Sequence, residues 1–136
     1  MLDTSILCGY YSRMTQENEI RILSSFLYAK GLVPEDCPIS DILYKAELVR
    51  ECFHKLIFDL DQASDDLSEE ELQSIFFEAG KLHFTKELRW WFEVLYQTFL
   101  KQKDGPRLGQ LAKLMTIYWM TDKLHSTLND PWMYRI

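Results

Sequence analysis

The chain has 136 residues, of which 47% are hydrophobic and 26% are charged, and its formal net charge is −6. This composition is typical of a globular protein, and the length fits one domain with a single core, which we place at residues 1–136. No segment reaches the ~18 consecutive apolar residues that a membrane-spanning helix needs. The acidic third residue argues against a secretory signal, and three widely spaced cysteines (Cys8, Cys37 and Cys52) fit the reduced thiols of a cytoplasmic protein.

Charge is distributed unevenly along the chain. Residues 1–80 carry 16 acidic and 6 basic side chains, whereas residues 81–136 carry 5 acidic and 9 basic ones. Such an asymmetry is expected if the basic half binds a polyanion, and equally if acidic and basic helices pair across the domain. An excess of four positive charges over 56 residues is modest for a phosphate-binding surface, so both explanations stay open.

Two helices are predicted in the first thirty residues. Asp3 or Thr4 can cap a short first helix that ends near Tyr11. Thr15 can then cap a longer helix with acidic residues in its first turn, and Gly31 is expected to end it.

The next helix is predicted from Ser40, as its N-cap, to about Gln62. Its apolar residues recur at helical spacing, which predicts one long inward face (Ile42, Leu48, Val49, Cys52, Phe53, Leu56, Ile57 and Leu60). The acidic segment 59–66 that follows is the expected connection to the second half of the chain.

Helix signals in the second half are stronger. Ser68 and Glu71 form a capping-box pattern that predicts a short helix ending at Gly80. Thr85 is the expected cap of the next helix, an aromatic-rich segment around residues 90–100 that has apolar residues on most of its faces. A helix of that kind normally lies at the centre of a bundle, with other helices around it.

A sharp turn at 104–107 follows this central helix, because proline and glycine cannot continue it. We expect Arg107 in the first turn of one last helix that fades near Leu128, and Trp132 and Tyr134 of the tail to fold back onto the domain. No stretch alternates polar and apolar residues. The predicted fold is therefore all-α, an irregular bundle of five or six helices around the central aromatic-rich helix.

This part of the sequence resembles a known protein domain. Trp91-Phe92 and Leu95-Tyr96 on the central helix, followed by the Gly-Pro-Arg-Leu-Gly turn at 105–109, match the pattern of the C-terminal helical domain of class I lysyl-tRNA synthetases. That domain, also called the anticodon-binding or helix-cage domain, is all-helical. The resemblance covers residues 66–128, about half the chain, and leaves residues 1–65 as additional helices.

The resemblance is broken at two places and implies only part of the synthetase function. Lys101 stands where the family usually has glycine, and Met115-Thr116 replaces a usual Leu-Gly. The His-x-Gly-His and lysine-rich signatures of the catalytic domain are missing from the sequence. The resemblance therefore implies a non-catalytic module that binds tRNA or another structured RNA, without a cofactor or a metal.

Basic residues around the turn are the first candidates for RNA contacts. Arg107 can bind a phosphate or stack on an unpaired base, and Lys101, Lys103 and Lys113 can extend a basic patch around it. A structural role for Arg107, as a partner of Asp104, Glu93 or helix carbonyls, explains the arginine as well. Each lysine is also compatible with a simple solvated face.

Two aromatic residues are the second candidates. Trp90 and Tyr96 lie off the main apolar stripe of the central helix, so they are better placed than the other aromatics to stack on unpaired bases. Most aromatic residues at helical spacing belong to the core, which is the alternative for both.

Two other classes of function remain. A helical interaction or scaffold module, which could self-associate or bind another protein, fits the net acidity and the 14% aromatic content. A metal enzyme is suggested by the Glu51-x-x-His54 and Asp122-x-x-His125 pairs, because carboxylate and histidine three residues apart recur in di-iron bundles. Glu51 and His54 fall off the apolar stripe, however, and are expected to face water.

Overall fold

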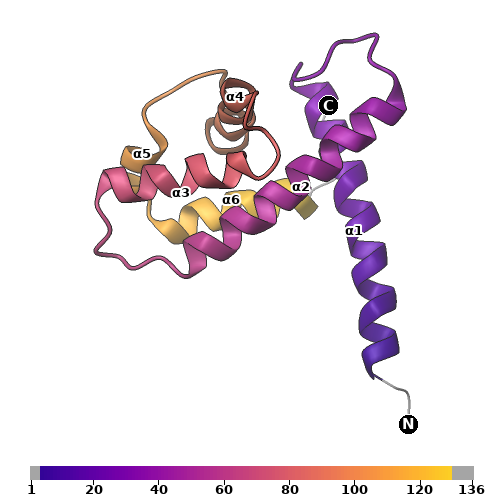
Figure 1. The fold of residues 1–136 in the computed structure, drawn as a ribbon, viewed down its shortest axis with the longest axis horizontal. Coiled ribbons are helices and arrows are strands. Elements are labelled where there is room, and N and C mark those ends of the chain that lie inside the picture. The colour runs from indigo at the N-terminus through magenta and orange to yellow at the C-terminus, as the bar shows by residue number, and fades with distance from the viewer. Residues whose placement is uncertain (1–3, 130–136) are drawn as a thin grey trace.

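The computed structural model describes residues 4–129, with side chains from residue 15 onward, and is shown in Figure 1. Its helices are α1 (Thr4–Ala29), α2 (Ile39–Asp61), α3 (Glu69–Lys81), α4 (Leu88–Leu100), α5 (Leu108–Met115) and α6 (Ile117–Asn129). Residues 4–129 contain no strand, so the predicted all-α fold is confirmed. No helix in this part of the chain is long and apolar enough to cross a bilayer. The tail residues Trp132 and Tyr134 lie outside the described residues.

The prediction of two helices before residue 31 is wrong, because α1 is one continuous helix of 26 residues. No proline or glycine separates Tyr11 from Thr15, so nothing interrupts the backbone hydrogen bonds, and Thr15 lies inside the helix instead of capping it. The predicted end is confirmed. Gly31 adopts a φ of 68°, and the N–H of Leu32 bonds the carbonyl of Leu27 at 2.9 Å.

Of the caps predicted for α2, α3 and α4, only the one at α3 is present. The box at the start of α3 is present, with the Ser68 hydroxyl accepting from the Glu71 N–H at 3.1 Å and the Glu71 carboxylate accepting from the Ser68 N–H at 3.3 Å. Ser40 is not the N-cap of α2, because the carbonyl of Pro38 already accepts the first helical N–H groups. Thr85 does not cap α4, because its hydroxyl donates instead to the Lys81 carbonyl.

The predicted single last helix is two helices, α5 and α6, separated at Thr116. This residue has φ 84° and ψ 153°, a conformation that no helix can include. Its N–H still closes α5 on the Ala112 carbonyl at 2.9 Å, and its hydroxyl accepts the Trp119 N–H at 3.2 Å at the start of α6. Threonine is not a helix breaker, so the residue type alone did not indicate this break.

The core lies where α2 and α6 cross the other helices. α2 packs against α1, α3 and α6, while α6 also packs against α4 and α5. Figure 1 shows the N-terminal part of α1 standing away from the remaining helices. The apolar face predicted for α2 is confirmed at Ile42, Val49, Cys52, Phe53, Leu56, Ile57 and Leu60, whereas Leu48 is only partly buried.

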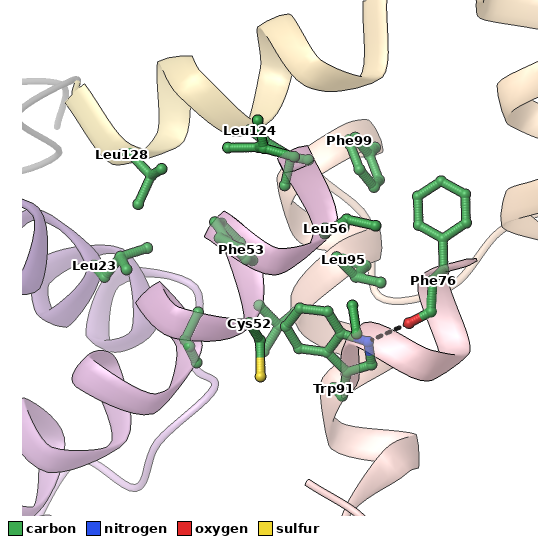
Figure 2. Close-up of a cluster of buried hydrophobic side chains, with 14 of the residues drawn as sticks. Leu23, Cys52, Phe53, Leu56, Phe76, Trp91, Leu95, Phe99, Leu124 and Leu128 are labelled. Atoms are coloured by element: carbon green, nitrogen blue, oxygen red, sulfur yellow. Dashed lines mark hydrogen bonds between the residues drawn. The ribbon is translucent and has the colours of Figure 1, made fainter. Parts of the chain in front are cut away.

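Trp91 anchors α4 in this core (Figure 2). Its side chain is fully buried, and its indole N–H donates to the Phe76 carbonyl of α3 at 3.0 Å. The ring meets Phe53 of α2 edge-on, with 5.9 Å between centroids. Because one face of α4 is fixed in this way, the opposite face, with Arg89, Glu93 and Tyr96, is exposed or partly exposed.

Candidate nucleic-acid interface

The connection between α4 and α5 begins with a left-handed residue. Lys101 is the C-cap of α4, with φ 56° and ψ 34°, and its N–H bonds the Gln97 carbonyl at 3.2 Å. The segment that follows, residues 101–107, is exposed throughout. It is fixed to α4 by Tyr96, whose hydroxyl donates to the Pro106 carbonyl at 2.9 Å. We call residues 101–107 the α4–α5 loop.

Arg107 is the N-cap of α5 and so lies one residue before the first turn in which it was predicted. Its backbone carbonyl accepts the Leu111 N–H at 3.0 Å, and its side chain is exposed. In the described part of the chain no carboxylate lies within 4.0 Å of its guanidinium, so neither Asp104 nor Glu93 forms the ion pair considered above. Lys101 and Lys103 are likewise exposed and outside any ion pair of residues 15–129.

A contact from α3 supports this end of α5. The Gln73 side chain accepts the Gly109 N–H at 2.8 Å, which satisfies one of the free donors at the helix start. Gly109 itself lies so close to α3 that a Cβ there would overlap the Glu69 carbonyl and approach the Gln73 nitrogen to 2.9 Å. The glycine of the turn thus permits a close backbone contact that positions Arg107.

Charged residues of the α4–α5 loop affect the pKa of Tyr96. Burial raises the pKa of its phenol above the usual value, the Asp104 carboxylate raises it further, and the Arg107 guanidinium lowers it. Both charged groups of the loop therefore act on the phenol, in opposite directions. Of the candidate residues predicted from the sequence, Tyr96, Lys103 and Arg107 are brought together here, with Lys101 at the start of the same loop.

Trp90 and Lys113 lie elsewhere. Trp90 sits at the other end of α4, half-buried, and its indole N–H donates to the Leu32 carbonyl at 2.8 Å. The ammonium of Lys45, on α2, lies 4.4 Å from the centre of its ring. The Trp90 side chain is thus already engaged with the α1–α2 connection through its N–H and with α2 through its ring. Lys113 is exposed on α5, where its ammonium donates to the Asp65 carbonyl in the α2–α3 connection at 3.3 Å.

A hollow on the outer face of α4 adjoins the loop and was missed in the sequence. It encloses about 320 Å³ and is lined by Arg89, Phe92, Glu93, Tyr96, Lys103 and Asp104. Phe92, Glu93 and Tyr96 are each partly exposed there, unlike Trp91 and Leu95 on the inward face. Phe92, which its helical spacing placed with Trp91 and Leu95 on the inward stripe, is only partly buried. The sequence signal that could have found the hollow is that residues 89, 92, 93 and 96 share one helical face.

Glu51 and His54, two of the residues considered for a metal site, each contact another side chain. The Glu51 carboxylate lies 2.7 Å from the ring of His83, and His54 shares the buried Glu19 carboxylate with Arg50, at 3.2 and 3.1 Å. Glu51 and His54 are exposed, as their place off the apolar stripe predicted. Among residues 15–129, no three histidine, cysteine or acidic side chains are grouped in a way that could hold a metal ion.

Known proteins resemble half of this chain. Lysine–tRNA ligase of Rickettsia prowazekii is 37% identical over 76 residues, which are 52% of this chain. The ligases of Rickettsia typhi and Rickettsia felis are 36% and 35% identical over 77 and 79 residues. Half of this chain is thus related to lysine–tRNA ligase. The matched stretch covers only 14% to 15% of the length of these ligases, and no family model and no solved structure matches the chain.

Proposed function

We propose that this chain is a non-catalytic, cytoplasmic module that binds tRNA or another structured RNA, in the manner of the anticodon-binding C-terminal domain of class I lysyl-tRNA synthetases. The observation that carries the proposal is the 35–37% identity to lysine–tRNA ligases over half the chain, because a protein of that name acts on tRNA. The part shared with such enzymes is a helical region without their catalytic signatures. The aminoacylation reaction is therefore assigned to other polypeptide segments.

The α4–α5 loop is the proposed point of contact with the RNA backbone. Three cations, Lys101, Lys103 and Arg107, are exposed there, and none of them has a carboxylate within 4.0 Å in residues 15–129. Cations that are not neutralised by the protein itself can release counterions from a phosphate backbone, which is the main source of affinity for nucleic acids. Tyr96 holds the loop to α4, and Gln73 of α3 holds the start of α5 directly after it, so both ends of the segment that carries the cations are fixed.

Binding to total tRNA at low salt tests the proposal. We expect a complex with the wild-type protein and a weaker one when Lys103 and Arg107 are both replaced by alanine. The matched control replaces Arg21 and Lys55, an exposed and a half-exposed cation on α1 and α2, which changes the net charge equally but leaves the loop intact. Absence of any complex with the wild-type chain contradicts the proposed function, and equal losses in the two double variants contradict the assignment to the loop.

A second candidate function is self-association or protein binding through exposed apolar side chains. Ile39 and Tyr44 at the start of α2 are 76% and 65% exposed, and Leu114 and Tyr118 on either side of the α5–α6 break are 77% and 79% exposed. Large apolar residues grouped on a surface are typical of interaction sites. Light scattering across a range of protein concentrations distinguishes this candidate, since a chain that stays monomeric throughout does not self-associate.

A further inference from the structure

A second hollow, which we call the α1–α6 hollow, lies between α1 and the end of α6. It encloses about 410 Å³, and its lining includes Asn18, Glu19, Arg21 and Ile22 of α1 with Leu128 and Asn129 of α6. None of its lining residues belongs to α4, α5 or the α4–α5 loop, so it is separate from the proposed RNA contact. One turn of an α-helix, ~10 Å wide and ~5.4 Å long, already occupies roughly 420 Å³. The hollow therefore suits a large side chain or a short extended segment, and is too small for a docked helix.

The lining of the α1–α6 hollow is partly apolar and partly polar. Leu128 is 1% exposed, and Ile22 is half-buried. Among residues 15–129, Ile20 of the same helix packs against the buried core, whereas Ile22 does not. The carboxamides of Asn18 and Asn129 provide hydrogen-bonding groups in the same hollow. Such a mixed lining fits tryptophan or tyrosine, because each combines a large apolar ring with one polar group.

The unpaired charge in the hollow is positive. The buried Glu19 carboxylate is neutralised by Arg50, whose Nε lies 3.1 Å from it. Arg21 is exposed, and among residues 15–129 no carboxylate lies within 4.0 Å of its guanidinium. An occupant that places a carboxylate beside Arg21 is therefore favoured over one that brings a cation.

The segment that follows α6 has the chemistry that this hollow requires. Residues 130–136 read Asp-Pro-Trp-Met-Tyr-Arg-Ile, and they start directly after Asn129, which itself lines the hollow. Pro131 disfavours continuation of the helix, so the chain is expected to turn away from the axis of α6. Trp132 comes three residues after Asn129 and can therefore lie at most ~11 Å from it, which is within reach of the hollow.

The acid at position 130 matches the free arginine. A carboxylate directly after the last residue of a helix lies at the negative end of the helix dipole, which is unfavourable unless a cation is close by. Arg21 lines the same hollow as Asn129, the residue that precedes Asp130. An ion pair between Arg21 and Asp130 offsets this cost and holds the start of the segment against α1.

We infer that the α1–α6 hollow is the docking site of the chain's own residues 130–136, with Trp132 packed against Ile22 and Leu128 and with Asp130 paired with Arg21. The chain's own segment is favoured over that of a second copy, because a tether this short gives an effective concentration on the order of millimolar. The docked segment ties the end of α6 to α1. The inference goes beyond the proposed function and does not depend on it.

A double-mutant cycle measured by urea denaturation of the full chain tests this inference. Trp132→Ala is expected to lower the urea midpoint by about 0.5–1 M, because a large aromatic side chain loses its burial. In the background of Ile22→Ala the same change is expected to lower the midpoint by less than half as much, since the two side chains contact each other. Ile75→Ala, which truncates another half-buried isoleucine on α3, is the matched control and should leave the effect of Trp132→Ala unchanged.

A second measurement does not depend on stability. The chain has four tryptophans, and the indole N–H signal that disappears from the NMR spectrum of Trp132→Phe identifies Trp132. That signal is expected to shift in Asn18→Ala, which changes an exposed residue of the hollow. It is expected to stay in place in Gln110→Ala, which changes an exposed residue of α5.

Two results overturn the inference outright: additive effects of Trp132→Ala and Ile22→Ala, or an unshifted Trp132 signal in Asn18→Ala. A urea midpoint that rises with protein concentration while the coupling persists overturns the assignment to the chain's own segment, because the hollow would then hold residues 130–136 of a second copy. Failure of the inference leaves the proposed function untouched, since the variants lie outside the α4–α5 loop.

Discussion

Lys101 and Thr116 are the two non-glycine residues with positive φ among those described, at 56° and 84°. They are also the two positions at which the sequence departs from the pattern of the domain that it resembles. The sequence therefore singled out both positions, but it did not predict their left-handed or extended positive-φ backbone conformation. Threonine in this conformation is strained, because its Cβ crowds the backbone where glycine has only hydrogen.

Replacing Thr116 with glycine is expected to stabilise the protein by about 1 kcal/mol. The substitution relieves ~1–3 kcal/mol of backbone strain. Part of this gain is offset, because the hydroxyl that caps α6 is lost and the unfolded chain becomes more flexible. Urea denaturation measures the difference. Thr116→Ala serves as the control, because it loses the bond to the Trp119 N–H but keeps the strain, and it should be destabilised by about 1 kcal/mol. A glycine variant no more stable than the alanine variant would show that Thr116 is unstrained.

Cys52 links stability to alkaline pH. Burial raises the pKa of its thiol from 9.0 to about 12, although a hydrogen bond from the His83 backbone lowers it. Below pH 9 the thiol is mostly protonated in the folded and the unfolded chain, so it contributes little to the pH dependence of the free energy of unfolding. Between pH 9 and 12 the unfolded chain loses this proton and the folded chain keeps it, so stability falls as pH rises, by up to about 1.4 kcal/mol per pH unit.

The Cys52→Ala variant isolates this effect. It loses some packing at every pH but has no thiol to ionise, so its stability deficit relative to the wild type should shrink between about pH 8 and about pH 10.5. Unfolding by urea at the two pH values gives the comparison. A deficit that stays constant would mean that the Cys52 thiol ionises equally easily in the folded and unfolded states.

At the scale of the helices, prediction of a cap succeeded where two residues indicate it together. Ser68 and Glu71 form a box that spans four residues and was visible in the sequence, whereas the single residue Thr85 bonds backward to Lys81 and leaves α4 without a side-chain cap. The cap of α5 comes from Gln73, which is 36 residues away. No sequence pattern indicates such a bond, because it depends on how α3 and α5 pack.

At Gly109 the backbone of α5 is in close contact with α3, and Gly109→Ala is expected to cost about 3 kcal/mol. The new methyl group would overlap the Glu69 carbonyl, and backbone atoms cannot move aside as a flexible side chain would. Urea denaturation measures the loss. Gln110→Ala, one residue along and exposed, should change stability by less than about 0.5 kcal/mol. Equal stability of the two variants would contradict the close packing of α3 and α5.

At the scale of the whole molecule, composition and periodicity predicted the all-α class and most of the core, because both follow from the spacing of apolar residues. The cations of the loop were predicted from the turn that exposes them. The hollow on α4 was not, since Arg89, Phe92 and Glu93 line it together with Lys103 and Asp104, which the fold of the loop brings beside them. Trp90 is the opposite case. Its place off the apolar stripe suggested stacking on RNA, but its indole N–H donates to the Leu32 carbonyl in the α1–α2 connection.

The uneven charge of the two halves gives the clearest expectation for the intact chain. A net charge of −6 repels RNA at long range, so binding requires local contacts from the basic residues of 81–136. Those contacts release counterions, and their number is read from the salt dependence of the affinity.

That salt dependence, measured for tRNA with the wild-type chain, Arg107→Ala and Arg21→Ala, tests the central claim most directly. The logarithm of the binding constant should fall linearly with the logarithm of the salt concentration, and Arg107→Ala should reduce the slope by about one, because one phosphate contact is lost. Arg21→Ala should leave the slope unchanged. Identical slopes for Arg107→Ala and the wild type, or no binding at low salt, would contradict the claim that the α4–α5 loop binds an RNA backbone.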